Sequence, residues 1–172
     1  DIDTTFADNR TELSSISDKL DSVSNNLGME ILRIELTGYA SPEGPYSNND
    51  RIASERTKAV KNYILSEKHL ADSIIWINHI AEDWEGLRKA IFSSALDDKV
   101  ELLDIIDSDM SFDAKEGELR HHGASWALIS KEILPGLRRT AYRIEYQHQY
   151  EEVELQTLEA VNRCISEGNI DE

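Results

Sequence analysis

The chain has little cysteine, little proline and few aromatic residues, and each shortage excludes something. Cys164 is the one cysteine among 172 residues, which excludes an intrachain disulfide and a metal site built from several cysteines. No apolar run approaches the ~20 residues that a membrane-spanning helix needs. The first ten residues, DIDTTFADNR, have neither the basic start nor the apolar block of a signal peptide. We therefore expect any signal or anchor to precede residue 1.

Basic residues are also scarce, with 18 Lys and Arg against 34 Asp and Glu, for a formal charge of −16. Such a field repels a phosphate backbone, so we expect no nucleic-acid partner. It equally disfavours docking on an anionic lipid surface through a basic patch. Apolar residues make up 40% of the chain, which is enough for a packed core. The length suits a single domain with an appendage.

The first half of the chain alternates helical and extended patterns. Residues 8–27 carry apolar side chains at steps of three and four, which predicts an amphipathic helix capped by Gly28. In residues 29–39 the period changes to two, which predicts a half-buried strand. One predicted face holds Leu32, Ile34 and Leu36, and the other holds Arg33, Glu35 and Thr37.

Residues 38–49, GYASPEGPYSNN, predict a loop because Gly, Pro, Ser and Asn dominate them. A second helix is predicted for 50–67. Residues 73–80 predict a further strand, although the unbroken apolar start of IIWINHI leaves a helix open.

The second half reads as helices around a polar segment. Helices are expected from residue 82 and over 100–106, a polar surface segment over 107–123, and a helix over 126–134 that Pro135-Gly136 ends. Residues 140–149 alternate as a strand and 151–167 predict a closing helix. Residues 2–6 are expected to add an opening strand. Sheet on one side and helices on the other is the natural packing, so we predict a two-layer α/β (α+β) fold.

Arg56 is the first candidate for a binding role. It projects from the apolar stripe of the second helix, four residues after Ile52 and four before Val60. A guanidinium there needs an anion or carbonyl partner, and the start of a helix favours negative charge. The loop and Arg56 therefore predict a site for a carboxylate-sized anion. The alternative is that Arg56 pairs with an acidic neighbour such as Glu55, Glu43 or Asp50.

The segment TGYASPEGPYSNNDRIASERTKAVKNYI resembles the peptidoglycan-binding C-terminal domain of outer-membrane protein A, the OmpA-like family. The family pattern is a strand ending in G-[YH]-T-D, a later glycine, an asparagine, and a helix reading L-S-x-x-R-A-x-x-V-x-x-Y-L. This sequence matches it without a gap at Gly38, Tyr39, Gly44, Asn49, Ile52, Ala53, Arg56, Val60, Tyr63 and Ile64. FADNRTELSSISDKL also resembles the start of the family's first helix.

The resemblance implies a β-α-β-α-β-(helical insert)-β order, a mixed sheet and helices on one face. It implies an OmpA-like domain over 1–150, an insert at about 82–135 and a C-terminal helix or tail over 151–172. It also implies a periplasmic, outer-membrane-associated module that binds the diaminopimelate of a stem peptide. Arg56 inherits the contact to the ligand carboxylate, and Asn49 helps to hold the ligand.

Where the family has the aspartate that meets the ligand ammonium, this chain has Ser41. Glu43 lies two residues away and is the candidate substitute. The glycines Gly38 and Gly44 are predicted to let backbone approach the ligand, beside Tyr39. GYASPEG, AEDWEGLRKAI and LPGLRRTAYRIEY resemble a variant group of the family from Bacteroidetes that carries the same change to serine.

No motif for catalysis, a cofactor or a metal is recognisable. There is no G-x-S-x-G elbow and no glycine-rich phosphate loop. We predict a non-enzymatic module without cofactor or metal. Two functions remain open: anchoring an envelope protein to peptidoglycan through Arg56, or an interaction scaffold for an envelope or fimbrial protein that has lost diaminopimelate binding because of Ser41.

Overall fold

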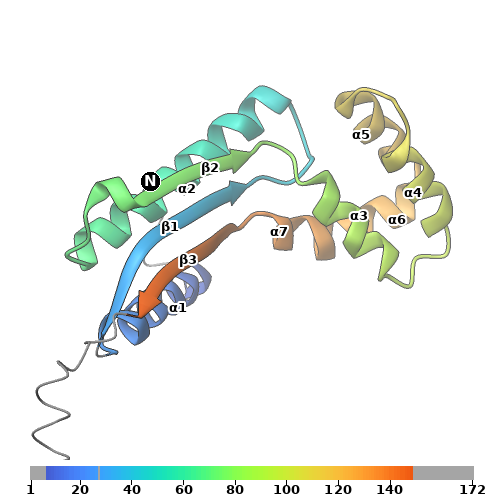
Figure 1. Cartoon of the computed structure of the whole chain (residues 1–172). Coiled ribbons are helices and arrows are strands. Elements are labelled where there is room, and N and C mark those ends of the chain that lie inside the picture. Colours follow the sequence, from blue (N-terminus) through green and yellow to red (C-terminus); the bar gives the residue numbers. More distant parts are fainter. Residues whose placement is uncertain (1–6, 27, 149–172) are drawn as a thin grey trace, which may run out of the picture.

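The computed structural model describes residues 7–26 and 28–148. Three strands form one mixed sheet in the order β2-β1-β3, with β1 at Met29–Tyr39, β2 at Ile75–Ile80 and β3 at Thr140–His148 (Figure 1). Strand β1 runs parallel to β2 and antiparallel to β3. The predicted two-layer α+β fold with a mixed sheet is confirmed. The predicted strand at 2–6 and helix at 151–167 lie outside the described residues.

Helices α1 (Ala7–Ser24) and α2 (Tyr46–Glu67) cover one face of this sheet. Apolar side chains from both helices and from β1 and β2 form the first core. Its buried members are Leu13, Ile16, Leu20, Ile34, Leu36, Val60, Ile64 and Ile75. The three-and-four spacing predicted for both helices therefore builds the helix layer of the fold.

The predicted face of β1 fails at one residue, Leu32. The pairing of β1 with β3 shifts register between Ile31 and Arg33, so Leu32 is the extra residue of a β-bulge. Leu32 is exposed, while Ile31 packs against the core in its place. Beyond the bulge, Ile34 and Leu36 are fully buried as predicted.

Residues 84–137, which we call the helical unit, lie between β2 and β3 in the chain and beyond the end of β1 in space (Figure 1). The unit contains α3 (Trp84–Phe92), α4 (Lys99–Asp107), α5 (Phe112–His121), α6 (Gly123–Leu128), a wide π-helical turn (Ile129–Ile133) and α7 (Leu134–Leu137). It has a core of its own, formed by Leu87, Ile91, Leu102, Ile106, Leu119, Ile129, Leu134 and Leu137.

Three predictions about the helices are wrong. Helix α2 begins at Tyr46 rather than 50, because Pro45 is its N-cap and the following polar residues form its first turn. The polar segment 107–123 contains α5, whose Ser111 caps the N–H of Ala114. Pro135 does not end a helix but stands in the first turn of α7, where its missing N–H needs no partner.

Among the described residues, no helix is both long enough and apolar enough to cross a membrane.

Candidate functional site

The residues singled out in the sequence lie around the C-terminal end of β1 and the loop that follows it. Loop 40–45 leads from β1 into α2 and faces the first residues after β2, the residues before β3, and α5. The backbone ties these segments together, since the N–H of Tyr39 donates to Arg139 O (2.8 Å) and the N–H of Asp83 donates to Ala40 O (3.0 Å).

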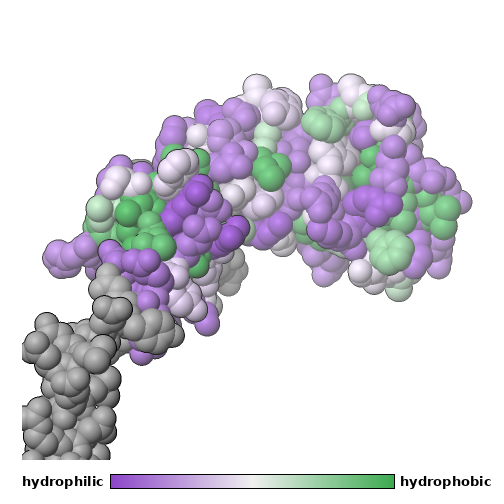
Figure 2. All heavy atoms as spheres, in the orientation of Figure 1, coloured by the Kyte–Doolittle hydropathy of each residue, from purple (hydrophilic) through white to green (hydrophobic). Residues whose placement is uncertain are grey.

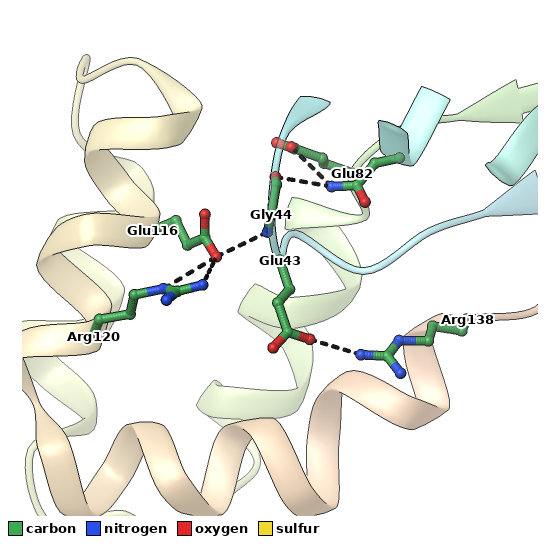
Figure 3. Close-up of polar contacts among 7 residues, drawn as sticks. Glu43, Gly44, Glu82, Glu116, Arg120 and Arg138 are labelled. Carbon is green, nitrogen blue, oxygen red and sulfur yellow. Dashed lines mark hydrogen bonds and ion pairs between the residues drawn. The ribbon is translucent and has the colours of Figure 1, made fainter. Parts of the chain in front are cut away.

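Ser41 and Glu43 both bind Arg138. The Arg138 guanidinium donates through Nε to Ser41 Oγ at 3.0 Å. It also donates through Nη2 to Glu43 Oε2 at 2.7 Å (Figure 3). Ser41 is buried, whereas the Glu43–Arg138 pair is partly exposed to water. A cation of the chain itself therefore occupies the loop side that the sequence analysis assigned to a ligand.

Asn49 lies buried in the first turns of α2. Its Nδ2 donates to Gly44 O (3.3 Å) and to Glu82 Oε1 (3.2 Å), and Glu82 also accepts from the Trp84 indole at 2.8 Å. A buried carboxylate is costly unless hydrogen bonds satisfy it, and these two donors do so. Asn49 thus joins α2 to the start of the helical unit.

Arg56 and Tyr39 contact each other through the backbone. Arg56 Nη1 donates to the carbonyl of Tyr39 at 2.5 Å, so a carbonyl is one partner of this guanidinium. The ring of Tyr39 lies under the guanidinium of Arg139, 4.2 Å from its centroid. Arg139 in turn pairs with the buried Asp83 at 2.5 Å. Tyr39 therefore lies between two arginines that approach from different elements.

The two glycines have different surroundings. Gly44 has φ +82°, which favours glycine, and its N–H donates to Glu116 Oε1 of α5 at 2.9 Å (Figure 3). A Cβ on Gly38 would lie 2.1 Å from Thr57 Oγ1 and 2.5 Å from Ala53 O. The absence of a side chain at Gly38 therefore lets α2 approach β1.

An aromatic stack completes the contact between α2 and the helical unit. The ring of Phe112 lies between those of Tyr46 (6.4 Å) and Trp84 (5.6 Å), near parallel to both. Lys115 lies beneath the Trp84 and Phe112 rings and donates to Ile106 O at 2.7 Å. The beginning of α2 is thus fixed to α5 and α3 by aromatic contacts as well as by hydrogen bonds.

The structure brings the predicted residues into one region, where they have partners within the chain. Arg56 binds Tyr39, Ser41 and Glu43 bind Arg138, and Asn49 binds Glu82. Among the described residues, no group of three or more His, Cys, Asp or Glu side chains is placed to hold a metal ion.

Five further residues of this region were not among the predicted site residues: Arg138, Arg139, Glu82, Asp83 and Glu116. The sequence contains one signal for four of them, the doublets Glu82-Asp83 and Arg138-Arg139. The first doublet follows a predicted strand and the second precedes one. When both strands neighbour the same third strand, the two doublets of opposite charge lie at the same end of the sheet. Glu116 gave none, because the segment that holds it was predicted to be an irregular surface.

A second polar cluster, within the helical unit, predicts a pH dependence. Asp98 accepts from Ser125 Oγ (2.6 Å) and contacts His122 Nδ1 (2.7 Å), and these two hydrogen bonds lower the pKa of Asp98 below its usual value. A carboxyl whose folded pKa is lowered stabilises the fold above its unfolded pKa of about 3.9, and that contribution is lost as the pH falls through the folded pKa.

We expect Asp98→Asn to flatten the decline in unfolding free energy below about pH 4. Urea denaturation across this pH range measures the unfolding free energy, with the exposed Asp97→Asn as control. Equal slopes of unfolding free energy against pH in all three chains would contradict the prediction.

In comparison with known proteins, no family model, no curated protein and no solved structure matches this chain.

Proposed function

We propose that the chain is a non-enzymatic binding module of the bacterial cell envelope, OmpA-like in its motif, that serves as an interaction scaffold for an envelope or fimbrial protein. The observation that carries the proposal is the position of Arg138. In the OmpA-like pattern the residue at position 41 receives the ligand ammonium. Here the Arg138 guanidinium donates to Ser41 and Glu43, and a ligand ammonium would have to displace it.

The helical unit supplies a surface for a protein partner. Phe92, Val100 and Leu128 expose more than half of their accessible surface. Figure 2 shows apolar side chains on this part of the molecule, between hydrophilic ones. Exposed large apolar residues are the type that protein interfaces bury. In a periplasmic, outer-membrane-associated chain such a surface would face assembly partners.

Peptidoglycan anchoring is the second candidate, and one observation favours it. The Glu43–Arg138 pair has side-chain exposures of 35% and 44%. Exposed ion pairs contribute only about 0–1 kcal/mol, so a diaminopimelate group could displace Arg138 at small cost. Arg56 would then bind the ligand carboxylate and Asn49 would border it, as the resemblance implies.

Titration with free diaminopimelate and with a diaminopimelate-containing muropeptide separates the two functions. Under the scaffold proposal, backbone NMR signals of Ser41, Glu43, Asn49 and Arg56 do not shift saturably at millimolar ligand. Saturable shifts that Arg56→Ala abolishes, and that Arg143→Ala on the open sheet face leaves unchanged, would overturn the scaffold proposal and establish peptidoglycan anchoring.

For the protein partner, binding of envelope extract proteins should fall in Phe92→Ser and persist in Arg143→Ala.

A further inference from the structure

Among the described residues, strand β2 pairs only with β1, so its outer edge is unpaired (Figure 1). Five of its six residues are exposed. Trp76 is 57% exposed, Ile77 43% and Ile80 38%. Natural edge strands are normally protected by charge, proline or a bulge, because they pair readily with other strands. The sequence of β2, IWINHI, has neither a proline nor a Lys, Arg, Asp or Glu.

The backbone groups that face away from β1 can be identified from their neighbours. The carbonyl of Ile80 accepts from Ala40 N and so faces β1. Carbonyls alternate along a strand, so those of Ile75, Ile77 and His79 face outward. Ile75 is already occupied, because its carbonyl accepts from Lys61 Nζ and its N–H donates to Asp72 O. This leaves Ile77 and His79 as the outward-facing pair of residues.

We propose that β2 pairs with β2 of a second copy of this chain, antiparallel, about a two-fold axis through Asn78. In this register Ile77 lies opposite His79 of the second copy, and their N–H and C=O groups form four hydrogen bonds. On the open face of the sheet Trp76 lies opposite Ile80 of the second copy. Aromatic and β-branched residues opposite one another stabilise paired strands.

The free hydrogen-bonding positions of the edge favour a second copy in this orientation. Ile77 and His79 are symmetric about Asn78, so a copy related by a two-fold axis occupies both of them with the same two residues. The charged side chains beside the edge already have partners within each copy, because Asp50 contacts His79 at 3.0 Å and Lys61 pairs with Asp72 at 2.9 Å. Each copy also carries a net charge of −16, which opposes association over longer distances. Added salt screens that repulsion, so the dimer should strengthen with ionic strength.

Cysteine cross-linking tests the register directly. Residues at a non-hydrogen-bonded antiparallel position have Cα atoms about 4.5 Å apart, within the range of a disulfide. In a Cys164→Ser background under mild oxidation, we expect Asn78→Cys to form a covalent dimer at least about tenfold faster than Thr37→Cys. Thr37 is the matched control, because it neighbours Asn78 on β1, one strand further from the edge.

Light scattering at submillimolar chain concentration gives the second test. The unmodified chain should show a weight-average mass above the monomer that rises with salt, and Ile77→Lys should reduce it to the monomer. Val100→Lys, a change at a more exposed residue on α4, should not. A monomer at every concentration together with equal cross-linking rates at 78 and 37 would overturn the proposal. The proposed pairing of β2 does not depend on what loop 40–45 binds. A negative result in the ligand titration therefore does not affect this proposal, and a negative result here does not affect the proposed function.

Discussion

Replacing Gly38 with alanine is expected to destabilise the fold by about 3 kcal/mol, at the upper end of the range for overpacking. The new Cβ would meet Thr57 Oγ1 at 2.1 Å and the backbone oxygen of Ala53 at 2.5 Å. The threonine hydroxyl is held by Ala53 O and Asn78 O, and the helix backbone cannot move without disturbing the core beneath it. Urea unfolding monitored by circular dichroism gives the free energy.

Two further variants separate this contact from a general effect of losing glycine. Gly117 lies within α5 with no atom near its missing Cβ, so Gly117→Ala should stabilise by about 0.5–1 kcal/mol. Adding Thr57→Ala to Gly38→Ala removes the nearer clash, and the two changes together should cost less than the sum of their separate effects. Additive losses, or a neutral Gly38→Ala, would show that β1 and α2 are not as closely packed as described.

Asp83→Ala should have an effect of similar size, a loss of about 2–4 kcal/mol of unfolding free energy. Asp83 is buried, caps α3 by accepting from Gly86 N at 2.9 Å, and pairs with Arg139. The alanine variant removes the cap and leaves Arg139 without that carboxylate. Because Asp83 joins the helical unit to the sheet, hydrogen exchange in α3 should rise more than in α2.

Asp83→Asn divides this loss into its two parts. Asparagine caps helices as well as aspartate does, so only the charged contact with Arg139 is lost, which we expect to cost about 1.5–3 kcal/mol. The control is Glu85→Ala, since Glu85 forms an exposed pair with Lys89 in the same helix and should leave the unfolding free energy nearly unchanged. A loss in Asp83→Ala no larger than in Glu85→Ala would contradict a joining role.

The parts of the fold that follow from short-range periodicity could be predicted from the sequence. The apolar stripes of α1 and α2 and the alternation of β1 and β3 each reflect burial against a single layer, and a local pattern is enough to detect that. Leu32 could not be placed, because a bulge depends on how β1 meets β3, about a hundred residues further along the chain. Helix α5 was missed because its buried side chains are only Lys115 and Leu119, too few for a stripe.

The candidate site could be located but not interpreted from the sequence. The motif from Gly38 to Arg56 places its residues around one loop, as the structure has them. Their partners are Arg138, Glu82 and Glu116, which come from distant parts of the chain, and no local pattern connects them to the loop. Contacts between residues far apart in the sequence decide whether a polar side chain is available to a ligand or already has a partner within the chain.

The helical unit is attached to the sheet at both of its ends, on opposite sides of β1. One end follows β2 through Asp83, and the other precedes β3 through Arg139. Since neighbouring strands are about 4.8 Å apart, the two attachment points are separated by about 10 Å whatever lies between them. We therefore expect that a folded segment whose ends are that far apart can replace residues 84–137 without changing the register of the sheet. Such an exchange would give the fold a different surface at this position and would leave the three-stranded sheet as it is.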